Sequence, residues 1–168
     1  MESRRIAVCP GSFDPVTLGH LDIIRRASNL FDKVIVLIST NVSKTKTSFD
    51  LPERLMLMEK VIVGMDNVVI DILDGLLAEY VRNAKATVIV KGLRAVSDFE
   101  YEFQMALANK KLYPAAETIF LTTTSENMFL SSSVVKNIAY FGGDISPFVP
   151  ECVCEDIKQR IHRTEEIS

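Results

Sequence analysis

The chain has 168 residues, of which 48% are hydrophobic and 24% charged, a balance typical of a globular protein with a substantial core. Its net charge of −3 gives no basic footprint for nucleic-acid binding, and no apolar run approaches the roughly 18 residues of a membrane span. The N-terminal segment lacks the apolar stretch of a signal peptide. We therefore expect one domain over residues 1–168, located in the cytoplasm, without nucleic-acid or membrane partners.

Apolar runs alternate with helical patterns along the chain. The expected strands lie at about 5–9, 33–40, 68–73, 86–91 and 118–123. The expected helices lie at about 18–31, 52–64, 76–84, 98–111, 131–141 and 150–162. Continuous apolar strands that alternate with helices favour a parallel sheet covered on both faces. The predicted fold is α/β, a doubly wound five-stranded parallel sheet of Rossmann-like type, in which ligands bind beyond the carboxyl ends of the strands.

A Gly-Ser-Phe-Asp-Pro turn and a Thr-x-Gly-His sequence directly follow the first strand, between Gly11 and His20. The start of a helix leaves backbone N–H groups unpaired at the positive end of the macrodipole, where phosphate binds. His20 lies at that end and can donate to the same phosphate. Taken singly, Gly11 and Pro15 can be turn residues, Thr17 a helix cap and His20 a surface residue. The G-x-G-x-x-G dinucleotide fingerprint is absent.

Cations follow two further strands. Lys44 and Lys46 lie in the loop after the second strand, where by themselves they can be solvated charges. Lys91 and Arg94 flank Gly92 at the end of the fourth strand, and a glycine there lets a ligand approach the backbone closely. After the fifth strand, three serines open an apolar helix, as a cap signal and as a second phosphate-binding helix end.

Three motifs together resemble the phosphopantetheine adenylyltransferase family, within the (His/Thr)-x-Gly-His nucleotidyltransferases. They are the turn that leads to Thr17-x-Gly19-His20, the segment from Lys91 to Glu102, and Leu130-Ser131-Ser132-Ser133. The resemblance covers about residues 4–160. The chain departs from the family pattern at Val42, where proline is usual, and before the serine triplet, where Phe129 is the one aromatic residue kept.

The resemblance implies transfer of AMP from ATP to 4′-phosphopantetheine, giving dephospho-coenzyme A and pyrophosphate, with Mg²⁺ carried by ATP and no metal ligand from side chains. It implies a catalytic set of His20 (the transition-state stabiliser), Lys44 and Arg94. The implied ATP site comprises Ser12, Phe13, His20, Gly92, Leu93, Arg94, Glu102, Asn127, Met128, Phe129, Leu130, Ser131, Ser132 and Ser133. The implied phosphopantetheine site comprises Ser12, Lys44, Leu77 and Lys91. The family also implies a homohexamer and coenzyme A as a feedback ligand.

Plainer interpretations stay open for some residues, and so do other functions. Leu76 or Leu77 can be a core residue at a helix start, and Cys152-x-Cys154 has the wrong spacing for a redox or zinc motif, so we expect free thiols. One alternative is another adenylyl- or cytidylyltransferase with a phosphate-bearing acceptor, such as nicotinamide mononucleotide or glycerol phosphate. Another is a nucleotide-binding regulatory module without turnover.

Overall fold

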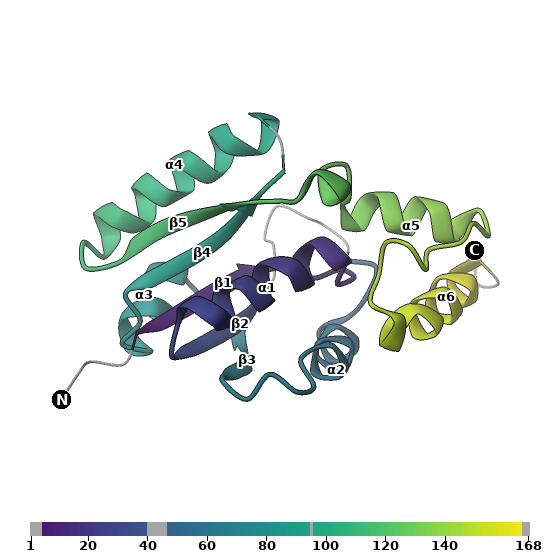
Figure 1. Cartoon of the computed structure of the whole chain (residues 1–168), viewed down its shortest axis with the longest axis horizontal. Helices are drawn as coiled ribbons and strands as arrows, with labels where there is room; N and C mark the ends of the chain where they lie inside the picture. Colours follow the sequence, from purple (N-terminus) through teal and green to yellow (C-terminus); the bar gives the residue numbers. More distant parts are fainter. Residues whose placement is uncertain (1–4, 40–46, 95, 166–168) are drawn as a thin grey trace.

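A computed structural model describes residues 5–39, 47–94 and 96–165 (Figure 1). Its centre is a five-stranded sheet in the order β3-β2-β1-β4-β5, in which every pair of neighbours is parallel. The strands are β1 (Ile6–Gly11), β2 (Lys33–Ser39), β3 (Val68–Leu73), β4 (Val88–Leu93) and β5 (Glu117–Thr122). The predicted fold class is confirmed.

Helices connect the strands. They are α1 (Leu18–Leu30), α2 (Leu51–Val61), α3 (Leu77–Asn83), α4 (Val96–Leu112), α5 (Ser132–Tyr140) and α6 (Glu151–Glu165). All the predicted elements are present, with ends that differ by up to three residues. A short 3₁₀ turn, η1 (Ser125–Asn127), was not predicted.

The core has two parts because successive side chains of a strand face opposite sides of the sheet. On one side, Ala7 and Val36 belong to a cluster with Ile24 of α1, Met58 of α2 and Ile157 of α6. On the other side, Val8, Ile35 and Leu37 pack with Val81 of α3, and α4 lies against α3 and β5. Both faces are therefore covered, which leaves the ends of the strands for a ligand.

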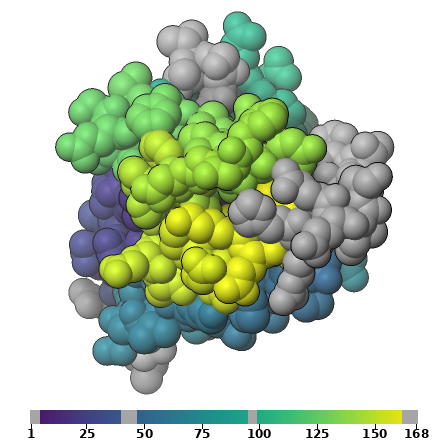
Figure 2. Space-filling model, turned by 90° about the vertical axis from the view of Figure 1, so that its right-hand side faces the viewer, coloured from purple at the N-terminus to yellow at the C-terminus, as the bar shows by residue number. Residues whose placement is uncertain are grey.

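The last two helices close one end of the molecule. Figure 2 shows α5 and α6 side by side across this end, with α2 below them, in agreement with their contacts. The buried residues Val135, Ala139, Val153 and Ile157 join these helices to the larger core cluster. The chain thus brings α5, which begins with two serines, next to the carboxyl ends of the strands (Figure 1). No helix in the described ranges is long and apolar enough to cross a membrane.

Candidate active site

A cleft of about 770 Å³ lies at the carboxyl ends of the strands. The ends of β1, β2 and β4 contribute Ser12, Ser39 and Lys91, and α1, α3, α4 and α5 supply the walls. This volume is in the usual range for a small-molecule site. Its position is the one at which doubly wound sheets bind ligands.

Ring packing, a hydrogen bond and an ion pair hold the turn after β1 in place. Phe13 has φ of 46°, and its ring covers Gly11, where an added Cβ would come within 2.9 Å of the ring. The left-handed residue of the turn is therefore Phe13, and glycine is needed at position 11 to make room for its ring. The buried Asp14 carboxylate accepts the Phe49 N–H at 2.8 Å and pairs with Lys136 Nζ at 3.1 Å. The Asp14–Pro15 peptide bond is cis.

His20 lies in the first turn of α1 and is part of its cap. The Thr17 N–H donates to His20 Nδ1 at 3.0 Å, and Thr17 Oγ1 accepts the His20 N–H at 3.4 Å, which completes a capping box. A backbone N–H can only donate, so Nδ1 is the unprotonated nitrogen of the ring. The neutral His20 ring therefore carries its proton on Nε2, as a hydrogen-bond donor. The Phe13 ring contacts it edge to face, with 5.0 Å between centroids.

The surroundings of His20 keep its ring neutral. Burial, and then the charges of Arg94 and Lys91, lower the pKa of His20 to about 4. At neutral pH the side chain thus donates a hydrogen bond without carrying a charge. Cys9 also lines the cleft, but burial raises the pKa of its thiol to about 12, so it stays protonated and is unsuited to act as a nucleophile.

Two cations, Lys91 within β4 and Arg94 just after it, are both held in place. Lys91 Nζ lies 3.2 Å from a carboxylate oxygen of Glu102 on α4, and both side chains are partly buried. Arg94 Nη1 donates to the Leu130 carbonyl at 2.8 Å, which links the end of β4 to the start of α5. Gly92 packs against α1, because an added Cβ would lie 3.0 Å from Ile23. Lys91 and Arg94 thus line the cleft in fixed positions.

Two helix N-termini meet this cleft. At α1, the Leu18 N–H donates to the Phe148 carbonyl at 2.9 Å, so the Gly19 N–H is the donor of that turn without a partner among the described residues. At α5, Ser131 Oγ caps the Val134 N–H at 3.2 Å. Ser132 Oγ donates to the Pro15 carbonyl at 2.7 Å, which ties the two helix ends together. Such ends attract phosphate through their amides and dipoles.

The sequence did not single out the α4 wall of the cleft beyond Glu102. Tyr101, Met105, Ala106 and Asn109 all line it. Asn109 is 7% exposed, and within the described part of the chain its side-chain amide has no hydrogen-bond partner. A side-chain amide without a partner that faces a cleft can recognise a polar part of a ligand. The one available signal was the apolar spacing of the helix, which does not distinguish a cleft wall from a core.

The predicted site residues fall into three groups. Those in the cleft wall are Ser12, Phe13, His20, Leu77, Lys91, Gly92, Arg94, Glu102, Leu130, Ser131, Ser132 and Ser133. Those outside its wall are Leu93, Asn127, Met128 and Phe129. Lys44 lies outside the described residues.

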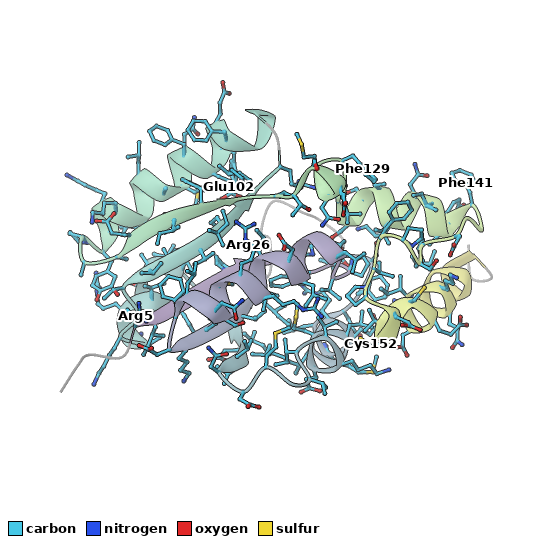
Figure 3. The ribbon with its side chains drawn as sticks, viewed as in Figure 1. Arg5, Arg26, Glu102, Phe129, Phe141 and Cys152 are labelled. Carbon is cyan, nitrogen blue, oxygen red and sulfur yellow. The ribbon has the colours of Figure 1, made fainter. Side chains whose placement is uncertain are left out.

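The second group has local reasons for its position. The Leu93 carbonyl accepts the Thr123 N–H, so this residue extends the sheet toward β5. Met128 and Phe129 are 53% and 60% exposed, and the Phe129 ring packs against Phe148. Figure 3 shows Phe129 at the turn between β5 and α5, on the outside of the molecule, whereas Glu102 lies on α4. Leu130 lines the cleft, although its side chain is buried in the core.

The comparison with known proteins agrees with this architecture. The sequence pattern of the cytidylyltransferase-like family matches residues 8–138. The solved structure of a Plasmodium falciparum nicotinic acid mononucleotide adenylyltransferase, complexed with NaAD, has the same fold with a TM-score of 0.70. It is 15% identical, over 97% of each chain. The chain therefore belongs to the cytidylyltransferase-like family, and it shares its fold with the solved nucleotidyltransferase.

The curated relatives give the particular family. A phosphopantetheine adenylyltransferase of Caldanaerobacter subterraneus is 53% identical over 95% of this chain and 99% of the relative. One from Dictyoglomus thermophilum is 54% identical over 92% and 93%. The chain belongs to the phosphopantetheine adenylyltransferase family. The predicted family, and with it the expectation of a nucleotidyltransferase of coenzyme A biosynthesis, is confirmed.

Proposed function

We propose that this chain transfers AMP from ATP to 4′-phosphopantetheine, giving dephospho-coenzyme A and pyrophosphate. The observation that carries the proposal is the convergence of donors on one cleft. Neutral His20, Lys91, Arg94 and the amides at the starts of α1 and α5 all line it. Membership of the family, shown by relatives at about half identity over nearly the whole chain, supports this choice of reaction.

The reaction needs alignment more than acid–base chemistry. The acceptor phosphate already carries an anionic oxygen, which attacks the α-phosphorus of ATP while pyrophosphate leaves. Catalysis then depends on holding the two phosphates in line and stabilising the extra charge on the α-phosphate. His20 Nε2–H is the donor we assign to that charge. Because Nδ1 is held by the Thr17 N–H at 3.0 Å, the direction of the donor is fixed before substrate binds.

The acceptor occupies the side of the cleft between β1 and α4 in this proposal. Lys91 and Ser12 contact its phosphate, together with Lys44, whose assignment is a prediction from the sequence. The pantetheine arm then runs along Leu77, Met105 and Ala106, which give an apolar wall. Asn109 supplies a free amide to one of the two peptide groups of the arm.

The nucleotide occupies the opposite side. Arg94 and the serines from the N-cap Ser131 to Ser133 hold the triphosphate, and Gly92, which lines the cleft, contacts it through its backbone. Glu102 lies at the border of the two subsites because its carboxylate is 3.2 Å from Lys91 Nζ. Glu102 contacts the nucleotide in this arrangement, as the resemblance implies. Only backbone contacts are assigned to Leu93, Asn127, Met128, Phe129 and Leu130.

Mg²⁺ enters with ATP in this proposal and neutralises phosphate charge. It usually keeps several waters and relies on phosphates. The part of the chain that the structure describes holds no group of three or more acidic, histidine or cysteine residues placed to bind a metal. Arg94, His20 and Lys91 are among the side chains that orient the phosphates around it.

The cellular location, the domain organisation, the oligomeric state and the feedback ligand are also part of the proposal. We place the protein in the cytoplasm, as one domain over residues 1–168. We also propose a homohexamer, supported by exposed apolar side chains of α4 such as Phe103 and Leu107, which are 45% and 56% exposed. Coenzyme A, which carries the same arm as the product, is the proposed feedback ligand.

Pyrophosphate release tests the reaction and its rivals. We expect release from ATP with 4′-phosphopantetheine, and none with pantetheine, nicotinamide mononucleotide or glycerol 3-phosphate. Release with one of the other phosphate acceptors, or from CTP, would favour the alternative transferases. Binding of ATP without release, for every acceptor, would favour a regulatory module. A His20→Ala variant in the same assay controls for contaminating activity.

A further inference from the structure

Arg54 is a buried cation that the reaction above does not use. It lies in the first turn of α2 and is 2% exposed. Its Nη1 donates to the Ser12 carbonyl at 2.8 Å and to the Ser39 carbonyl at 3.1 Å, and its Nε contacts the Asp50 carbonyl at 3.4 Å. The guanidinium thus joins the ends of β1 and β2 at the floor of the cleft.

The three carbonyls accept hydrogen bonds from Arg54, but they do not pair its charge. Among the described residues, no carboxylate lies within ion-pair distance of it. Nearby acids have other partners, since Asp50 caps the Glu53 N–H, Glu53 pairs with Arg160, and Asp14 pairs with Lys136. Buried charges are normally paired.

The helix makes this position still less favourable for a cation. A positive side chain in the first turn of α2 lies at the positive end of the helix dipole. An uncharged side chain could fill the same volume at a lower electrostatic cost. The retained charge therefore fits a partner that is present only when the cleft is occupied.

The groups that Arg54 holds identify this partner. Ser12 and Ser39 both line the cleft. A hydrogen bond from a cation to the Ser12 carbonyl polarises the peptide that joins Ser12 to Phe13, so its N–H becomes a stronger donor. Phe13 in turn contacts the His20 ring. The bond to Ser12 therefore fixes the turn that carries the acceptor contact and the Phe13 ring that packs against His20.

We propose that Arg54 is a positioning residue for the acceptor phosphate. It fixes the ends of β1 and β2 at the cleft floor and supplies positive charge that becomes paired when the acceptor phosphate binds above them. The inference rests on the proposed function, since it takes the phosphate of the acceptor as the anion. A structural role alone would affect every ligand equally, whereas this role discriminates between ligands with and without that phosphate.

The test compares two ligands that differ by one phosphate. Titration calorimetry gives the dissociation constants of 4′-phosphopantetheine and pantetheine, and their ratio measures recognition of the phosphate. Arg54→Gln removes the charge and keeps one donor, Arg54→Lys keeps the charge, and Arg25→Gln removes a charge from an exposed position on α1. Melting temperatures of all four proteins are measured alongside.

We expect the ratio to fall about tenfold in Arg54→Gln, the size of effect expected for the loss of one partly screened charge near the phosphate. It should stay within about threefold of the wild-type ratio in Arg54→Lys and Arg25→Gln. Equal weakening of both ligands in Arg54→Gln would overturn the proposal and leave a structural role. If that variant does not fold, Arg54→Lys decides, and a tenfold fall there contradicts the charge argument. A wild-type ratio near one would instead contradict the proposed function.

Discussion

Replacing His20 with alanine removes two interactions at once, and a second variant separates them. The ring accepts the Thr17 N–H at Nδ1 and offers a proton at Nε2. His20→Asn places an amide oxygen near the Nδ1 position, so it retains an acceptor for the cap and has nothing at the Nε2 position. Alanine loses both. The pair of variants therefore distinguishes a role in folding from a role in turnover.

The expected magnitudes differ clearly. Loss of the cap bond in His20→Ala costs about 1 kcal/mol of unfolding free energy, whereas His20→Asn keeps most of it. Loss of one preorganised donor to the transition state costs about 10²–10³-fold in turnover, and we expect this in both variants. Since the interaction forms mainly in the transition state, kcat and kcat/KM should fall together. The affinity for ATP should change little, because Arg94 and the α5 amides still hold the nucleotide.

Steady-state pyrophosphate release gives kcat and KM, calorimetry gives ATP affinity, and urea unfolding gives stability. Full activity in His20→Asn would refute the role of Nε2. A weaker affinity for ATP with unchanged kcat would make His20 a ground-state ligand of the nucleotide. Parallel loss of stability and activity in both variants would leave only the cap.

Three further predictions follow from the cleft and the surface. The pKa of His20 is about 4 in the folded protein and near 6.5 in the unfolded chain, so the neutral ring contributes fully to stability above pH 6.5, and this contribution, at most about 3 kcal/mol, is lost as the pH falls toward 4. Nitrogen NMR of the two histidines should show a neutral His20 ring with its proton on Nε2 at pH 7. A titration midpoint near 6.5 for His20 would contradict this prediction. Lys91→Ala should weaken the binding of 4′-phosphopantetheine at least about tenfold more than the binding of ATP. Because this variant also leaves Glu102 without its ion-pair partner, the titration is repeated in a Glu102→Gln background. Equal losses of affinity for both ligands would contradict the assignment of Lys91 to the acceptor. Replacing Cys152 and Cys154 by serine should leave turnover unchanged, since the thiols are free and lie outside the cleft wall, and loss of activity in a folded variant would reveal a missed site.

The fold could be predicted because each element carries a local signal. Continuous apolar runs such as Val34–Ile38 define buried strands, and capping residues such as Thr17 and Ser131 mark helix starts that the structure confirms. The arrangement of the residues around His20 could also be predicted from the sequence, since they are close together in the chain and the helix geometry alone brings them together. The local structure of a motif that is continuous in the chain can therefore be predicted well from the sequence.

Contacts between side chains of different helices and strands could not be predicted from the sequence in this way. The pairing of Lys91 with Glu102 depends on how α4 packs against β4, and the resemblance placed the two residues on different substrates. The sequence does not distinguish Asn109 from any other polar residue of a helix, because its role depends on the position of α4 along the wall of the cleft. Arg54 is a similar case, because its partners belong to strand ends that meet only in the folded sheet.

The most direct test of the account follows the α-phosphate itself. The protein is incubated with ATP labelled at the α-phosphate, with and without 4′-phosphopantetheine, and the products are separated. The account predicts that the label moves into dephospho-coenzyme A, with one pyrophosphate released for each labelled product, and that it stays in ATP when the acceptor is absent. Label that remains in ATP with the acceptor present, or that appears as free AMP without it, would contradict the account.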